Sequence, residues 1–135
     1  MHERSKLLDA VERALENQTV VDVVDAVQEE DLPCVVVEER EETMRGFDET
    51  LARPATVLRR RYRLVVFSFG ATRRARDDLA ETIERLITPA IVGAGYRCAL
   101  VGVGFSRSRV GTGSPAHVAG QFYDAEYTTP TYTPA

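Results

Sequence analysis

Two stretches of the chain carry apolar residues at helical spacing. In the first, apolar residues at positions 7, 8, 11 and 15 alternate with charged ones, which predicts an amphipathic helix over about residues 5–17, capped by Ser5. In the second, an apolar stripe runs from Ala75 to Ile87 behind Thr72, a good capping residue. Pro89 lacks the backbone N–H that a helix interior needs, so we expect the second helix to end there.

Extended structure is predicted between and after the two helices. The valine-rich residues 20–27 have an ambiguous period, and we expect a strand or an extended segment there. Residues 32–37 predict a strand whose proline must lie at its start or on a sheet edge. The longest candidate, residues 57–69, is basic in its first half and apolar in its second. Two further strands, over residues 96–105 and 117–128, predict an antiparallel hairpin.

This order of elements predicts the fold class. Two helices interspersed with strands of this kind predict an α+β fold, with a mostly antiparallel sheet and two helices packed on one face. A chain of 135 residues has the common size of a single domain. We expect residues 1–128 to form that domain and residues 129–135, rich in threonine and proline, to be an extended C-terminal tail.

Two connections between the predicted elements lack apolar periodicity. Residues 43–56 predict a loop of about a dozen residues, and loops of that length in compact domains are usually functional or disordered. Residues 107–116 are glycine-rich and predict a flexible connection between the last two strands. We expect both connections to contact partner proteins through apolar side chains, namely Phe47, Leu51 and Val110.

Charged residues cluster on both sides of the first predicted loop. The acidic run is Glu38, Glu39, Glu41 and Glu42, and the basic run is Arg59, Arg60, Arg61 and Arg63. Arginine pairs bidentately with carboxylates, so two such runs suit facing surfaces of neighbouring subunits or partners. The basic run, together with arginines 73, 74 and 76, also raises the possibility of nucleic-acid binding. A formal net charge of −4 argues against direct, specific DNA binding.

Residues typical of catalysis are few. The chain has two histidines, His2 and His117, and its serines lack the sequence context of a hydrolase nucleophile. Cys34 and Cys98 lie in apolar runs without a second ligand at metal-binding spacing, so we interpret them as buried hydrophobic residues. The sequence therefore predicts no enzyme activity, no cofactor and no metal. No stretch approaches the roughly 20 apolar residues of a transmembrane helix, so we expect no membrane partner.

The order of elements resembles the tail-terminator, or tail-completion, proteins of long-tailed viruses. The resemblance rests on the N-terminal helix, the short strand over residues 32–37 and the polar loop that follows. It continues in the segment from Tyr62 to Ala80, a strand, turn and helix, and in a C-terminal hairpin that reaches Tyr127. It covers nearly the whole chain.

This resemblance implies a structural virion protein, a tail terminator or a related neck protein. Such proteins cap the tail tube, join it to the neck and assemble as rings of about six copies. The implied partners are further copies of the chain, tail tube proteins and neck proteins, and DNA passes through without sequence readout. The implied location is the virion, after assembly in the host cytoplasm. The alternative is a cellular small-molecule-binding or regulatory α+β domain, for which we expect a ligand-dependent monomer or dimer.

Overall fold

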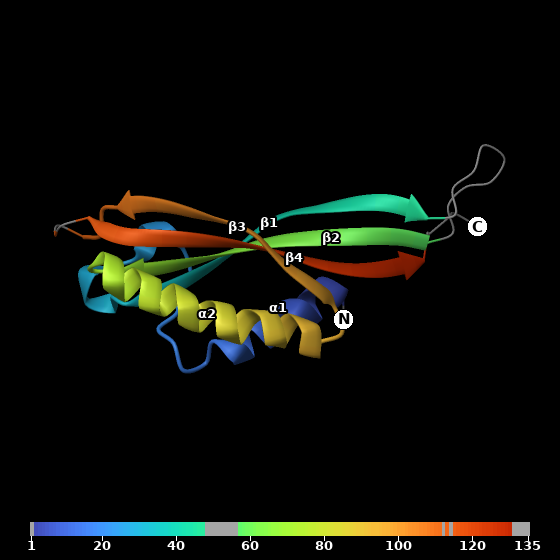
Figure 1. Ribbon diagram of the computed structural model, residues 1–135, viewed down its shortest axis with the longest axis horizontal. Coiled ribbons are helices and arrows are strands. Elements are labelled where there is room, and N and C mark those ends of the chain that lie inside the picture. The colour runs from blue at the N-terminus through green and yellow to red at the C-terminus, as the bar shows by residue number, and fades with distance from the viewer. Residues whose placement is uncertain (1, 48–56, 112, 114, 131–135) are drawn as a thin grey trace.

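The computed structural model describes residues 2–47, 57–111, 113 and 115–130, except for the side chains of residues 46 and 47 (Figure 1). Leu51 and the rest of the predicted loop beyond Phe47 therefore lie outside the described residues, as does most of the predicted tail. The elements in chain order are α1 (Glu3–Ala14), the short 3-10 helices η1 (Val24–Ala26) and η2 (Glu29–Asp31), β1 (Cys34–Phe47), β2 (Val57–Gly70), α2 (Arg73–Gly93), β3 (Arg97–Ser108) and β4 (Ala116–Pro130).

The four strands form one antiparallel sheet in the order β1-β2-β4-β3. Strands β2 and β4 are central, and β1 and β3 are the edges. Both helices lie against the same face of the sheet, and the far ends of β1, β2 and β4 extend past them (Figure 1). The predicted α+β class, with a mostly antiparallel sheet and two helices on one face, is confirmed.

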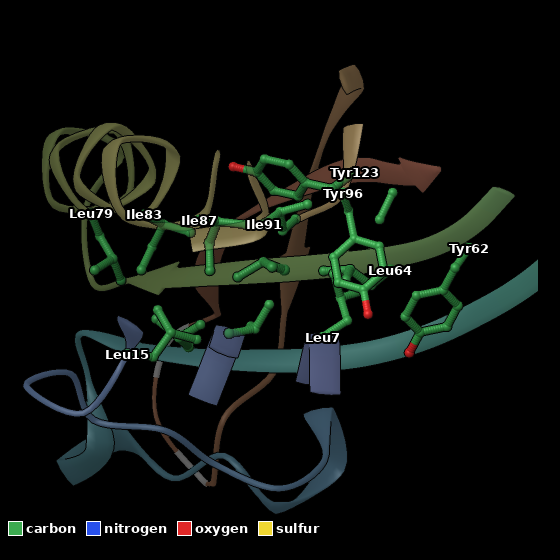
Figure 2. Packing of buried hydrophobic residues seen from close by; sticks show 14 residues of the cluster. Leu7, Leu15, Tyr62, Leu64, Leu79, Ile83, Ile87, Ile91, Tyr96 and Tyr123 are labelled. Atoms are coloured by element: carbon green, nitrogen blue, oxygen red, sulfur yellow. The ribbon is translucent and has the colours of Figure 1, made fainter. Parts of the chain in front are cut away.

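The main core lies between the helices and the sheet. Figure 2 shows one stripe of α2 side chains pointing toward β2: Leu79, Ile83, Ile87 and Ile91. Leu64 on β2 is fully buried beneath them, and Leu7 of α1 joins the same cluster. Helix α2 therefore packs on the side of β2 that carries Leu64 and Val66, whereas Phe69 of the same strand points to the other face.

The bounds of the helices differ from the predicted ones. Helix α2 continues through Pro89 to Gly93, so the prediction that this proline ends the helix is wrong. Ile91, two residues beyond Pro89, has no exposed surface. Burying such a side chain contributes about 1.5–3 kcal/mol, comparable with the cost of about 3 kcal/mol for an internal proline. Helix α1 begins at Glu3, not at Ser5, because the His2 ring accepts a hydrogen bond from the backbone N–H of Arg4 at 3.0 Å.

A second cluster covers part of the opposite sheet face. Side chains alternate along a strand, so Cys34 and Val36 of β1 point away from the face that carries Val35 and the helices. The segment before β1 crosses to that side, and the cluster consists of Val27, Cys34, Val36, Phe69, Val110, Ala116 and Val118. The predicted extended segment over residues 20–27 makes one parallel bridge, between Val20 and Val35, and then turns into η1.

Strand β1 is much longer than predicted. Residues 43–47 pair with β2 down to Val57, so the prediction of a loop beginning at position 43 is wrong. The charged residues after Val37 are therefore part of the strand, and the strand does not end before them. Their partners on β2 are the basic half of that strand, and this long-range pairing stabilises an extended backbone that local sequence does not indicate.

Candidate interaction surface

The basic half of β2 places three arginines on the sheet face opposite the helices. Arg59, Arg61 and Arg63 alternate with residues that face the helices, and we call these three the arginine ladder. Their partners on β4 are acidic at two of the three positions, with Arg63 opposite Asp124 and Arg61 opposite Glu126. The ladder on β2 and its acidic partners on β4 therefore occupy the two central strands of the sheet.

Two arginines of the ladder, Arg61 and Arg63, form ion pairs with acidic residues of the same chain. Arg63 holds Asp124 with a two-pronged contact, Nε to Oδ1 at 2.8 Å and Nη2 to Oδ2 at 3.0 Å. Arg61 donates from Nε and Nη2 to Glu126 Oε1 at 3.1 and 2.9 Å. The hydrogen bonds that Arg63 donates to Asp124, and the negative charge of Asp124, raise the pKa of Arg63. Two of the arginines predicted to meet acids on a neighbouring subunit thus meet them inside their own.

The acidic run divides between the two faces of the sheet. Glu42 is on the helix side and its side chain is almost buried, so this member of the acidic run does not face a neighbouring subunit. It is held by Arg60 at 3.1 Å and Arg4 at 3.3 Å and accepts a hydrogen bond from the Tyr127 hydroxyl. Burial and that bond raise the pKa of Tyr127. This group of side chains ties α1 to the end of the sheet.

The remaining members of the acidic run are more exposed. A bulge separates Glu39 from Glu41, and Glu41 reaches Arg63 on the other face at 3.9 Å. Glu38 pairs with Arg40 of its own strand at 3.2 Å. Glu39 and Glu41 are both exposed, so these two acids of the run remain accessible to another molecule.

The predicted partner contact at Val110 is wrong. Val110 has an exposed fraction of 1% and belongs to the second core cluster, packed with Val27 and Val118. The connection between β3 and β4 folds back over the sheet, because burying this valine is favourable without any partner. Of the other two predicted contacts, Leu51 lies outside the described residues, and so does the side chain of Phe47.

The surface that the sequence analysis missed is the outer edge of β3. Val101, Val103 and Phe105 have exposed fractions of 49%, 43% and 64%, and we call them the β3 edge patch. The Arg76 guanidinium of α2 lies 4.6 Å from the Phe105 ring centre and leaves most of the ring open. The apolar run was visible in the sequence, but its exposure depends on β3 being the last strand in the sheet.

Two glycines accompany the β3 edge patch. A Cβ on Gly102 would meet no atom within 4 Å, and one on Gly104 would only touch Phe122 at 3.9 Å. By contrast, a Cβ on Gly70 would come within 2.4 Å of the Arg76 backbone nitrogen. Packing inside the subunit thus explains Gly70 but not the two β3 glycines. Strand β3 has a bulge next to this pair, seen as a shift of register between Leu100 and Gly102.

A shallow hollow lies between the arginine ladder and β3. It has a volume of about 340 Å³ and is lined by Arg61, Arg97, Cys98, Ala99, Val101, Asp124 and Glu126. Burial raises the pKa of the Cys98 thiol, which keeps it protonated and unreactive near neutral pH. Within the described ranges, no three His, Cys, Asp or Glu side chains gather as a metal site.

Comparison with known proteins finds no match for this chain, either among models of protein families or among curated proteins. In the part of the chain that the structure describes, no helix is long and apolar enough to cross a bilayer.

Proposed function

We propose that this chain is a structural virion protein, similar to a tail terminator or a related neck protein, which assembles with copies of itself into a ring. In that role it caps the tail tube and joins it to the neck, and it performs no chemical reaction. DNA passes through the ring without its sequence being read. The resemblance in the order of elements motivates this role, and the surface of β3 supports self-association.

The observation that carries the proposal is the open, apolar edge of β3. Natural proteins protect edge strands with charges, prolines or covering elements, because unpaired backbone groups invite another strand. Strand β3 is 12 residues long, contains no proline, and exposes Val103 and Phe105 on the helix side of the sheet and Val101 on the other side. A strand of this kind is suited to an interface with another protein.

Two further features agree with a joining role. The far ends of β1, β2 and β4 extend beyond the helices, so they reach past the body of the subunit (Figure 1). Arg61 and Arg63 are occupied by Glu126 and Asp124, so these two arginines are poorly placed to bind phosphate groups tightly. DNA as passing cargo, rather than a sequence-specific ligand, fits that arrangement.

Native mass spectrometry with electron microscopy of the purified chain tests the proposal. We expect closed rings of about six copies, because a head-to-tail contact closes when its rotation divides a full turn. The ring should also bind the end of a purified tail tube, seen as a cap in the images. A chain that stays monomeric at concentrations up to about 100 µM would contradict the proposal.

The hollow beside Asp124 favours a second candidate, a small-molecule-binding or regulatory domain. Its volume of about 340 Å³ is within the range of ligand sites, and Arg97 at its rim suits an anionic ligand. Thermal unfolding with a panel of small carboxylates and phosphates distinguishes the two functions. A ligand that raises the melting temperature of a monomer, with Arg97→Ala abolishing the rise, would favour this candidate over the ring.

A further inference from the structure

We propose that the ring forms by pairing the β3 edge of one copy with the β1 edge of the next copy. This inference rests on the proposed ring and names the surfaces that build it. The sheet then continues from subunit to subunit, with the β3 edge patch covered by the neighbouring copy. Four observations support this pairing.

The first observation is that both edges of the sheet are available. Within the described residues, no strand pairs with the outer side of β3 from Arg97 to Ser108. The outer side of β1 is occupied at its beginning, where Val35 donates to the Thr19 carbonyl and accepts from the Val21 N–H, both at 2.9 Å. Among those same residues, nothing pairs with the outer side of β1 after Val37.

The second observation is strand direction. In the antiparallel order β1-β2-β4-β3, β1 and β3 run in opposite directions. A rotation about an axis along the strands keeps their direction, so β1 of the next copy meets β3 antiparallel and continues the pattern of the sheet. A two-fold pairing of β3 with β3 would close a dimer and leave both β1 edges open.

The third observation is charge. Strand β3 carries Arg97 and Arg107, both exposed, and has no acidic residue. The free part of β1 carries the acidic run, of which Glu39 and Glu41 are exposed, together with the exposed Arg40 and Arg45; four acidic and two basic residues leave it negative. Pairing β3 with β1 brings opposite charges together, whereas pairing β3 with itself brings arginines together.

The fourth observation is the pair of glycines on β3. Glycine in a strand is unfavourable for stability, and neither Gly102 nor Gly104 is needed to avoid a clash inside the subunit. They pair with Phe122 and Gly120, on the face opposite the helices, and leave that face of the edge flat. A neighbouring copy can therefore approach β3 closely on this side.

Charge reversal on each edge, separately and together, tests the pairing. One variant carries Arg97→Glu and Arg107→Glu on β3, a second carries Glu39→Lys and Glu41→Lys on β1, and a third carries all four changes. We expect each double variant to raise the concentration for half-dissociation of the ring at least about tenfold. The fourfold variant should recover the ring, because the charges of the two edges have exchanged sign and attract again.

Matched controls and folding checks accompany the variants. Arg13→Glu with Arg74→Glu makes the same change in net charge on the helices and should leave the ring intact. Circular dichroism and urea unfolding show whether each variant subunit is folded. If a β3 variant does not fold, Val103→Ser with Phe105→Ser replaces it, with Val92→Ser on α2 as its exposed control.

The possible results separate the two proposals. If the unmodified chain forms no ring, the proposed function fails, whatever the variants do. If the unmodified chain forms a ring and either double variant assembles as well as it does, the pairing of β1 with β3 is wrong while the ring stands. Dissociation of both double variants without recovery in the fourfold variant also overturns the pairing, because the two edges then do not face each other.

Discussion

At the residue scale, two buried tyrosines differ in one interaction. Tyr96 donates to Glu3 Oε2 at 2.6 Å and to the Glu3 carbonyl at 2.9 Å, whereas the Tyr123 hydroxyl has no hydrogen-bond partner among the described residues. Burying a hydroxyl removes it from water, and without a hydrogen-bond partner nothing offsets that desolvation free energy. Tyr123→Phe should therefore leave the free energy of unfolding unchanged or raise it by up to about 1 kcal/mol.

Tyr96→Phe is the matched comparison and should lower the midpoint of urea unfolding, because it removes the link between α1 and the start of β3. Urea unfolding of both variants measures the difference. A loss of stability in Tyr123→Phe as large as in Tyr96→Phe would show that the Tyr123 hydroxyl has a partner.

Ile83 supplies a second prediction at this scale. Its side chain has no exposed surface and lies in the middle of the α2 stripe. Ile83→Ala should lower the free energy of unfolding by about 2–5 kcal/mol, through lost burial and the cavity left behind. Val92→Ala, on the exposed side of the same helix, should change it by less than about 0.5 kcal/mol. Equal effects of the two substitutions would mean that α2 does not pack as described.

At the element scale, Pro89 is the feature of α2 that most departs from helical rules. It lies inside the helix, is exposed, and leaves the Arg85 carbonyl without its usual backbone donor. Pro89→Ala restores that donor and should raise the free energy of unfolding by about 1–3 kcal/mol.

Urea unfolding of Pro89→Ala provides the measurement, with Pro115→Ala in the connection before β4 as the control. The control should not gain stability, since removing a loop proline only adds freedom to the unfolded chain. No gain in Pro89→Ala would indicate that the neighbouring turns already compensate for the missing bond.

At the scale of the whole molecule, the change of stability at alkaline pH follows from its buried tyrosine and cysteine side chains. Burial raises the pKa of Tyr62, Tyr96, Tyr123 and Tyr127, and it raises the pKa of Cys34 to about 11. The folded chain then keeps protons that the unfolded chain releases from pH 9 to 10 upward. This contribution to stability is fully present below that range and is lost as pH rises through the folded pKa values.

Urea unfolding between pH 7 and 11 measures this loss of stability. We expect a constant midpoint up to about pH 9 and a steady decrease above it. Tyr123→Phe should weaken that decrease, because one of the titrating groups is gone. A midpoint that stays constant to pH 11 would contradict the burial of these side chains.

The sequence by itself determined the local elements of the fold. The apolar spacing from Ala75 to Ile87 and the run before Gly70 are signals within one element, and the structure contains both the helix and the strand. The α+β class follows from their order. Such features depend on residues close together in the sequence, because the helix period of 3.6 residues and the strand period of 2 residues both appear in a short stretch of chain.

The tertiary structure decided which residues are available to other molecules. Arg61 finds Glu126 at a separation of 65 residues, and Val110 is covered by residues from the segment before β1. Phe105 is exposed because β4, not β3, lies beside β2. Strand order and register come from pairings between distant parts of the chain, whose free energy depends on the whole sheet and not on any local pattern.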